Sequence, residues 1–530
     1  MTDLVGTRAL VRLALRRDRV MLPLWIAVLV ATAASSAWAT ADLYPTLSSR
    51  VRAATSFNDI QSLVALYGRV YDPPTTGGLA LVKLGGIGAV FVALLAILVV
   101  VRHTRAEEEA GRLELLGATV VGRYAALTAA LLVAVGANLA LAVGTAVGLI
   151  AAGLPADGSI AFGLAWAGVG IAFAGVAGVA SQLTRSARSA TGIAVGVLGL
   201  MYLLRAIGDT AERAGPRSLI WLSPIGWGQQ LRPYAGDRWW VLLLLVGLGL
   251  AAATGAYALL ARRDLGAGLV PDRPGPPAAA PSLRSPLALA WRLQRGALLG
   301  WTAGFAVLGL VFGNVASSIG DFATPEAQDL ITRLGGVEGL TDAYIRVCLV
   351  VIGMTASAYG VQAALRLRSE ETAQRAESIL ATATGRIRWA WSHVLIAVVG
   401  TTLLVAVGGA AAGIMRGVQT GDAGKGGAML GGALAQAPAA CVVTGIVVAL
   451  FGLAPRFVAA GWGVLAAFVL LGELGPLFEL DQRVLDVSPF AHAPRIPGDA
   501  LTVTPLLTLT ALAALLILAG LAGFRRRDVG

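Results

Sequence analysis

Long apolar runs recur along the whole chain, separated by short stretches that hold most of the charged residues. Runs of about 20 apolar residues match the length of a helix that crosses the hydrocarbon core of a bilayer. The pattern therefore predicts about twelve membrane-spanning helices. The expected spans are residues 21–40, 79–101, 124–152, 160–181, 191–208, 241–261, 297–316, 343–365, 391–414, 428–452, 456–474 and 502–524. Spans 191–208 and 456–474 are the least clear, because Arg205 and Glu473 lie at their edges.

The second half of the chain repeats the first. The matching stretches are RAEEEAGRLE at 105–114 with RSEETAQRAE at 368–377, SP at 223–224 with SP at 488–489, and RRDLG at 262–266 with RRDVG at 526–530. Three matches in the same order indicate a tandem repeat rather than chance. Six spans in each half make the halves parallel, related by an axis along the membrane normal.

This repeat sets the expected fold and domain organisation. We expect an all-α polytopic membrane protein of two parallel six-helix halves. Residues 1–266 form the first half with an N-terminal amphipathic interface helix, and residues 287–530 form the second half. Between them, the Pro- and Ala-rich residues 267–286 are expected to be an extended cytoplasmic linker.

Composition excludes other classes of protein. Only 13% of the residues are charged and 57% are hydrophobic, whereas roughly 25% are charged in an ordinary globular protein. A soluble enzyme or a disordered chain is therefore excluded. Cys348 and Cys441 both lie in apolar runs, and the three histidines are far apart in sequence, so no disulfide framework or metal site is expected.

The net charge of +11 indicates orientation in the membrane. With the N-terminus inside, the cytoplasmic segments hold a clear excess of Lys and Arg, as the positive-inside rule requires. We therefore expect a multi-pass protein of the bacterial cell membrane with both termini in the cytoplasm. The first span could instead be a cleaved signal peptide, but its counterpart at 297–316 cannot be one, so we keep it as a helix.

A basic amphipathic stretch precedes the first span of each half. Such stretches lie in the membrane interface, with arginine toward anionic headgroups, and we expect contact with the bilayer rather than with nucleic acid. The residues concerned are Arg8, Arg12, Arg16 and Arg19 in the first half, and Trp291, Arg292 and Arg295 in the second.

The repeated acidic–basic element lies between the second and third spans of each half. Glu108 and Arg112 are four residues apart, as are Glu371 and Arg375, a spacing that predicts an ion pair on a short surface helix. One such element could be an ordinary solvated loop helix. Its presence in both halves favours a role in docking a partner or in gating, because loops ordinarily tolerate change.

The loops after the fifth spans, residues 209–240 and 475–501, are expected on the external side of the membrane and are rich in aromatic residues and proline. Aromatic residues at this depth mark the headgroup boundary, and Pro-broken apolar stretches also suit re-entrant segments. The two interpretations are compatible, and both remain open. The residues that lead to them include Trp221, Pro224 and Trp227 in the first loop, and Pro476, Phe478, Pro489 and Phe490 in the second.

Several patterns are missing from the sequence. Gly424-Lys425-Gly426 lacks the Ser or Thr of a phosphate-binding loop, and Gln419 stands where its leading glycine should be. No Asp, Glu or His lies in the middle of a predicted span, although an ion-coupled pump is expected to have one. The chain is therefore predicted to be no enzyme, to bind no cofactor of its own, and to draw its energy from another subunit.

The repeated acidic–basic element resembles the signature of actinobacterial ABC exporter permeases of the polyketide-antibiotic (tetronasin-resistance) type. The resemblance covers the whole chain and implies a type-2, class V-like ABC exporter fold. In that fold, the loop between the second and third spans meets the ATPase subunit. The residues carried over to this coupling or gate role are Glu107, Glu108, Arg112 and Glu114 in one element, and Glu370, Glu371, Arg375 and Glu377 in the other. Thr372 and Gln374 depart from the first copy, which implies unequal coupling.

The resemblance implies the permease subunit of an ATP-driven exporter of amphipathic or hydrophobic compounds, including antibiotics and drugs. Its partners would be two copies of a separately encoded ABC ATPase, which bind ATP and Mg²⁺, together with the bilayer and the exported compound. The substrate-binding residues are unknown. The alternative is a proton-coupled secondary multidrug transporter, which also has twelve spans but whose loop between spans two and three is usually rich in Gly, Asp and Arg. A membrane-bound lipid or glycan enzyme is a weaker alternative, because no catalytic acidic cluster stands outside the spans.

Overall fold

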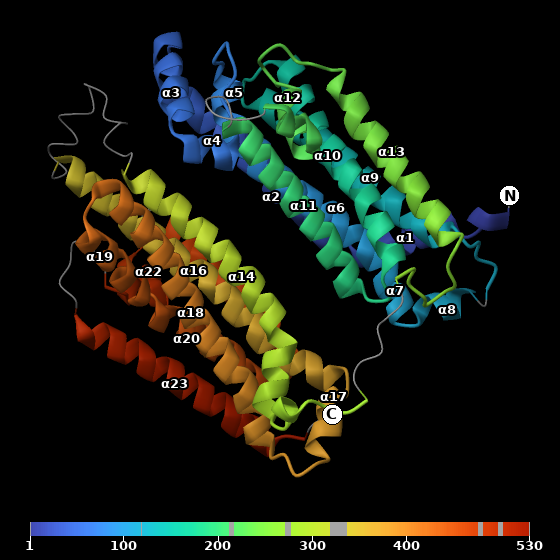
Figure 1. Ribbon diagram of the computed structural model, residues 1–530, viewed down its shortest axis with the longest axis vertical. Helices are drawn as coiled ribbons and strands as arrows, with labels where there is room; N and C mark the ends of the chain where they lie inside the picture. Colours follow the sequence, from blue (N-terminus) through green and yellow to red (C-terminus); the bar gives the residue numbers. More distant parts are fainter. Residues whose placement is uncertain are drawn as a thin grey trace. The chain divides into compact units, whose positions relative to one another are not determined.

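A computed structural model describes residues 2–117, 119–210, 217–270, 277–317, 336–474, 481–494, 496 and 502–528. The chain divides into two compact units, Met1–Pro274 (unit 1) and Gly275–Gly530 (unit 2). Throughout the described residues the regular structure is helical (Figure 1). Among these residues, eleven helices are long and apolar enough to cross a membrane, so the predicted class of an all-α polytopic membrane protein is confirmed.

Unit 1 begins with a short helix and continues through six candidate spans. Its elements are η1 (Thr2–Leu4), α1 (Thr7–Arg17), α2 (Met21–Leu43), α3 (Leu47–Asp59), α4 (Gln61–Tyr67), α5 (Thr76–Lys83), the π-helix η2 (Leu84–Gly88), α6 (Ala89–His103), α7 (Arg105–Glu109), α8 (Arg112–Gly117), α9 (Ala125–Ala151), α10 (Ala156–Leu183), α11 (Ala187–Thr210), η3 (Arg217–Leu222), α12 (Pro224–Gln230) and α13 (Val241–Leu260). Helices α7 and α8 lie at one end of this unit, and α3, α4 and α12 lie at the other (Figure 1).

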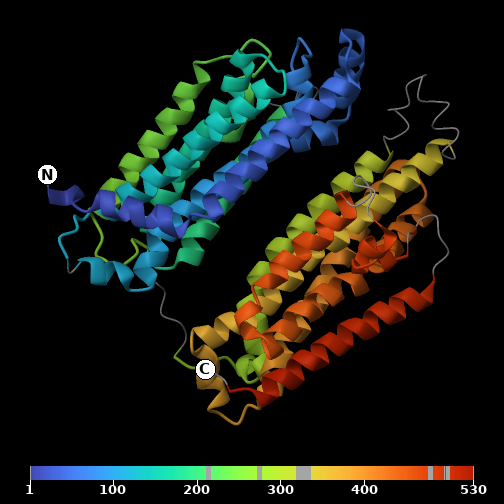
Figure 2. The same cartoon turned by 180° about the vertical axis from the view of Figure 1, so that it is seen from behind.

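Unit 2 contains the other five candidate spans. Its elements are η4 (Pro281–Leu283), α14 (Pro286–Ser317), α16 (Gly336–Thr372), α17 (Arg375–Leu380), α18 (Arg386–Thr420), α19 (Ala423–Leu434), α20 (Ala437–Leu453), η6 (Pro455–Phe457), α21 (Ala460–Leu474), α22 (Gln482–Leu485), η7 (Pro489–His492) and α23 (Val503–Arg526). Helix α23 runs along the length of the unit (Figure 2).

The eleventh predicted span, 456–474, is a shorter helix than expected. Its place is taken by η6 and the 15-residue α21, whose apolar part is shorter than the other spans. The fourth span of unit 2 is not one continuous helix. Helices α19 and α20 together make one apolar stretch, Gly426–Leu453, that is interrupted near Gln436.

One helix is buried at the centre of each unit. In unit 1, α10 packs against α9, α13, α6 and α11, and 78% of its most apolar window is buried, compared with 22% for α2, α11 and α13. In unit 2, the stretch Gly426–Leu453 is buried to the same extent. The outer helices expose leucine and valine, which suits contact with lipid tails that are equally apolar.

Glycine lets these central helices approach their neighbours closely. A Cβ atom on Gly163 of α10 would lie 2.5 Å from the carbonyl oxygen of Ala142 on α9, and one on Gly452 of α20 would overlap the backbone of Gly520 on α23. Small residues at helix contacts are how transmembrane helices pack in the absence of a hydrophobic drive between them. These contacts bring the central helices close to their neighbours along their length.

Candidate functional site

The first acidic–basic element is two short helices rather than one. Helix α7 follows the second span directly and ends at Glu109, and α8 starts at Arg112. Gly111 between them has φ of +70°, a left-handed conformation that glycine adopts without strain. The chain therefore turns sharply between Glu108 and Arg112. The expected ion pair between these two side chains requires a continuous helix, so it cannot form here.

Glu108 is the centre of a buried charged cluster in unit 1. Both of its carboxylate oxygens accept hydrogen bonds from the guanidinium of Arg263, at 2.6 and 2.9 Å. The backbone N–H of Gly266 donates to Oε1 at 2.6 Å, and Nη1 of Arg105 lies 3.1 Å from Oε2. The three charged side chains are all less than a tenth exposed. The cluster joins the end of the second span to the segment that follows α13.

Arg105 and Arg263 extend this cluster to the central helix. Nε of Arg105 donates to the carbonyl of Ser181 at 3.0 Å, and Nε of Arg263 donates to Oε1 of Gln182 at 2.7 Å. Both partners lie at the end of α10. A buried cation needs hydrogen bonds of this kind as well as a counter-ion to offset its desolvation. Three spans of unit 1 are therefore fixed to one another at this end.

Glu107 holds the N-terminal helix to the same element. It accepts from Arg17 of α1 at 2.5 Å and from Arg112 at 2.7 and 2.8 Å. The hydrogen bonds to Glu107 raise the pKa of the Arg112 guanidinium. Arg112 therefore pairs with Glu107, whereas both carboxylate oxygens of Glu108 accept hydrogen bonds from Arg263. The predicted Glu108–Arg112 pair is wrong for this reason.

Unit 2 contains the same arrangement at its own element. Arg527 donates to both carboxylate oxygens of Glu371, at 2.5 and 2.9 Å, and Arg368 adds a bond at 2.9 Å. Arg375 binds Glu370 at 2.7 Å, so the predicted Glu371–Arg375 pair is wrong for the same reason as in unit 1. The ion pair that joins the second span to the last span is therefore present twice.

A further contact is repeated beside each of these ion pairs. Arg123 donates to the backbone carbonyl of Arg263 at 3.0 Å, and Arg386 donates to that of Arg527 at 2.8 Å. The sequence repeat described above did not include Arg123 and Arg386. The recurring RRD sequence after each last span was the signal that could have found Arg263 and Arg527.

The two elements differ in detail. Oε2 of Glu109 accepts the N–H of Ala187, the first residue of α11, at 2.8 Å, whereas the hydroxyl of Thr372 in the second element bonds to its own helix at Arg368, at 2.9 Å. Gln374 has φ of +56° at the position that corresponds to Gly111 in the first copy. The turn is therefore present in both elements, but the backbone of Gln374 is strained because this residue has a Cβ atom. Among the residues that the structure describes, Glu109 ties the first element to its fifth span, and Thr372 makes no equivalent bond in the second.

Other predicted members of the elements face solvent. Glu114 and Glu377 are exposed, and the side chains of Arg112 and Arg375 are 50% and 55% exposed. The buried carboxylates position the elements, and the exposed side chains of α8 and α17 are the ones available to another molecule.

The basic stretches before the first spans are exposed, as their patterns indicate, but they differ between the units, and Arg19 lies in the turn between α1 and α2. Helix α1 ends at Arg17 and α2 begins only at Met21, so the first stretch is a separate helix. In unit 2, α14 runs unbroken from Pro286 through the basic stretch into the span. Their exposed residues are Arg8, Arg12, Arg16, Arg19, Trp291, Arg292 and Arg295.

The described residues of the segments after the fifth spans include short helices that are packed into their units. Ser223 caps α12 by accepting the N–H of Gly226 at 3.3 Å, and Pro224 is buried. Trp227 donates to the carbonyl of Trp221 at 2.6 Å. In unit 2, Pro489 and Phe490 are buried in η7. The predicted positions Pro476 and Phe478 lie outside the described residues.

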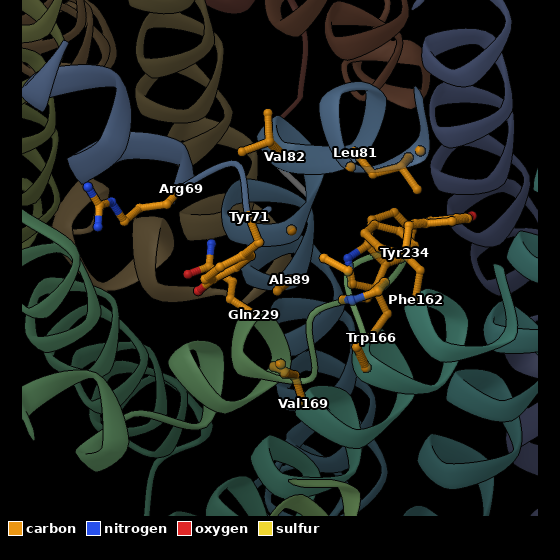
Figure 3. Close-up of a pocket in the computed structure, with 17 residues that line it drawn as sticks. Arg69, Tyr71, Leu81, Val82, Ala89, Phe162, Trp166, Val169, Gln229 and Tyr234 are labelled. Carbon is orange, nitrogen blue, oxygen red and sulfur yellow. The ribbon is translucent and has the colours of Figure 1, made fainter. Parts of the chain in front are cut away.

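Two cavities in unit 1 share a wall near α12. The first is small, about 60 Å³, and its aromatic side is formed by Phe162, Trp166 and Tyr234 (Figure 3). The second measures about 530 Å³ and is lined mostly by polar side chains. Arg69 and Tyr71 line both. Burial raises the pKa of Tyr234 to about 12 and also raises that of Tyr71, so both phenols are neutral hydrogen-bonding groups.

Comparison with known proteins matches the chain over nearly its whole length. A family model described as the C-terminal domain of the multidrug efflux system permease Rv1217c matches residues 8–263 and 283–525, one stretch in each half. The multidrug efflux system permease protein Rv1217c of Mycobacterium tuberculosis is 46% identical over 528 residues, which covers 99% of this chain and 95% of that protein.

Proposed function

We propose that this chain, which belongs to the family of multidrug efflux permeases that includes Rv1217c, is the membrane-spanning permease of an ATP-driven exporter. Two copies of a separately encoded ABC ATPase dock on the two acidic–basic elements, on the cytoplasmic side, and bind ATP and Mg²⁺. Closure of the ATPase pair moves the elements, and the halves move amphipathic or hydrophobic compounds outward. Both termini of the chain lie in the cytoplasm.

The observation that carries this proposal is the repeated buried ion pair. Glu108–Arg263 and Glu371–Arg527 each fasten the element after a second span to the end of a last span. A push on α8 or α17 is therefore passed to the ends of the spans rather than absorbed by a loose loop. Two equivalent elements suit a pair of identical ATPase subunits, because each subunit would meet the same surface.

The test is coexpression of the chain with an ABC ATPase encoded next to it, followed by purification in lipid nanodiscs. We expect a complex of one permease and two ATPases whose ATP hydrolysis rises when an exported drug is added. The double variant Glu108→Ala/Glu371→Ala should abolish this drug-stimulated hydrolysis. Failure to form a complex, or full stimulation in the double variant, would refute the coupling role.

Proton-coupled secondary transport is the alternative, and one buried carboxylate bears on it. Asp209 is 5% exposed near the end of α11, but it is paired with Arg205 at 3.3 Å. Arg205 also donates to the carbonyls of Ala65 and Leu66, at 2.8 and 3.1 Å. These bonds tie α11 to α4, which is a structural role. Loss of drug efflux on ATPase inhibition but not on collapse of the proton gradient would favour the exporter.

A further inference from the structure

The two cavities of unit 1 have opposite chemistry and meet at Arg69 and Tyr71. The small cavity is bounded by apolar and aromatic side chains, among them Trp166, Phe162 and Leu81. Arg69, Arg232 and Arg238 contribute three cations to the larger cavity, with Asp72 and Asp209 as its acidic residues. Both cavities lie within unit 1, at the end that carries α12. The proposed coupling to an ATPase gives neither cavity a role.

The wall of the apolar cavity is built from irregular backbone of the second span. Leu84–Gly88 form a π-helix between α5 and α6, and Nε1 of Trp166 donates to the carbonyl of Leu84 at 3.2 Å. Gly85 and Ala89 line the cavity beside it. A single π-helical turn within an α-helix is frequently found at functional sites, because it changes the direction of the side chains.

Two of the cations that line the polar cavity, Arg232 and Arg238, lack a counter-ion among the described residues. The guanidinium of Arg232 lies over the ring of Tyr71, 4.5 Å from its centroid, and its Nε is buried without a hydrogen-bond partner. Within the described part of the chain, Arg232 and Arg238 have no carboxylate within ion-pair distance, whereas Asp209 is already paired with Arg205. Burial lowers the pKa of Arg232, since a desolvated cation is unfavourable unless an anion joins it.

A buried amide oxygen without a partner belongs to a residue that lines the small cavity. Gln229 is 8% exposed and lines that cavity. Its Nε2 donates to the carbonyl of Tyr67 at 2.7 Å, but its Oε1 is buried with no partner. Buried amide oxygens are nearly always hydrogen-bonded, so this oxygen is available to a donor on a ligand, such as a hydroxyl group.

We propose that these two adjoining cavities together bind an amphipathic anion, whose charged head lies among Arg69, Arg232 and Arg238 and whose narrow apolar part enters the pocket beside Trp166. The cavity of about 60 Å³ admits an alkyl end rather than a fused ring system. The inference names a substrate class and in that respect rests on the proposed export function. An exported amphiphile and an anionic lipid share this chemistry, and the experiment separates them.

The experiment measures binding of radiolabelled laurate to the permease alone, in nanodiscs of zwitterionic phosphatidylcholine. We expect saturable binding of laurate, and weak, non-saturable uptake of the uncharged dodecanol. Arg232→Gln and, separately, Arg238→Gln should each weaken laurate binding about tenfold. Arg52→Gln is the matched control, because Arg52 is an exposed arginine of α3 at the same end of the unit, and it should bind laurate normally.

A second arm repeats the measurement in nanodiscs that contain phosphatidylglycerol. Competition by this lipid would identify the anion as a membrane lipid, and unchanged laurate binding would identify it as a free amphiphile. Equal uptake of laurate and dodecanol, or an equal loss of affinity in Arg52→Gln and both cavity variants, would overturn the site. Because no ATPase is present, failure of the proposed complex to form would leave this result unaffected.

Discussion

Arg263 donates hydrogen bonds from Nη1 and Nη2 to the two carboxylate oxygens of Glu108, at 2.6 and 2.9 Å, although 155 positions of sequence separate the two residues. Arg527 and Glu371 form the same pair in unit 2. Bidentate pairs of this kind combine charge with fixed geometry. In each half, the end of the second span is therefore held rigidly against the end of the last span.

Glu108→Ala should destabilise the protein strongly, because it leaves Arg263 and Arg105 buried without a counter-ion. Removing one partner of a buried ion pair costs about 3–5 kcal/mol. Thermal unfolding in detergent, followed by tryptophan fluorescence, measures this. Arg262→Ala, a change at the neighbouring exposed arginine, is the control and should leave the midpoint unchanged. An unchanged midpoint for Glu108→Ala would contradict the role of this pair.

Charge reversal on the exposed parts of the elements should weaken ATPase binding without unfolding the chain. In Glu114→Lys/Glu377→Lys both changes are at exposed positions, so we expect at least a tenfold loss of affinity for the ATPase and a normal unfolding midpoint. Copurification of the two subunits measures the effect. Asp42→Lys, an exposed change at the far end of α2, is the control. Equal copurification of all three proteins would show that α8 and α17 do not form the docking surface.

Gln374→Gly should stabilise unit 2, since Gln374 has φ of +56°. Relief of a left-handed conformation at a residue with a Cβ is worth about 1 kcal/mol. Ser378→Gly is expected to lower stability instead. It places glycine at an exposed position in the middle of α17, where glycine costs about 0.5 kcal/mol. Unfolding midpoints compare the two variants. A lower midpoint for Gln374→Gly would mean that its side chain makes a contact that outweighs the strain.

Gly452→Leu should prevent α20 and α23 from packing, because even a Cβ at this position overlaps the backbone of Gly520. Overpacking of this kind costs about 1–3 kcal/mol or more, and we expect less folded protein in size-exclusion profiles. Gly463→Leu is the matched control, since a Cβ there meets nothing within 4 Å. Similar profiles for both variants would be inconsistent with the close helix contact.

Asp209→Asn should retain drug efflux if ATP drives transport, because the amide cannot carry a proton but keeps the shape of the side chain. Drug accumulation in cells, with and without a proton-gradient uncoupler, provides the measurement. Arg205→Gln is informative beside it, since it leaves the buried Asp209 without its partner and should lower the amount of folded protein. Loss of efflux in Asp209→Asn at a normal protein level would support proton coupling instead.

Much of the helical architecture could be predicted from the chain itself. Apolar run length located all eleven long candidate spans, because a bilayer demands that length whatever the neighbours are. The prediction was weaker for 456–474, where α21 is short. It was also wrong on the pairing within the charged elements, since the spacing of Glu108 and Arg112 assumed a continuous helix, whereas Gly111 turns the chain.

The sequence by itself determined that this is a helical membrane protein, and it marked Arg105, Glu108 and Arg263 as parts of a repeated pattern, because composition and repetition are properties of the chain alone. Only the tertiary structure decided which charges meet. Arg263 reaches Glu108 because α10, packed through glycine, holds the ends of α6 and α13 together. Ion pairs between distant residues depend on helix packing. Likewise, the adjoining cavities at Tyr71 exist only after segments that are far apart in the sequence fold against one another.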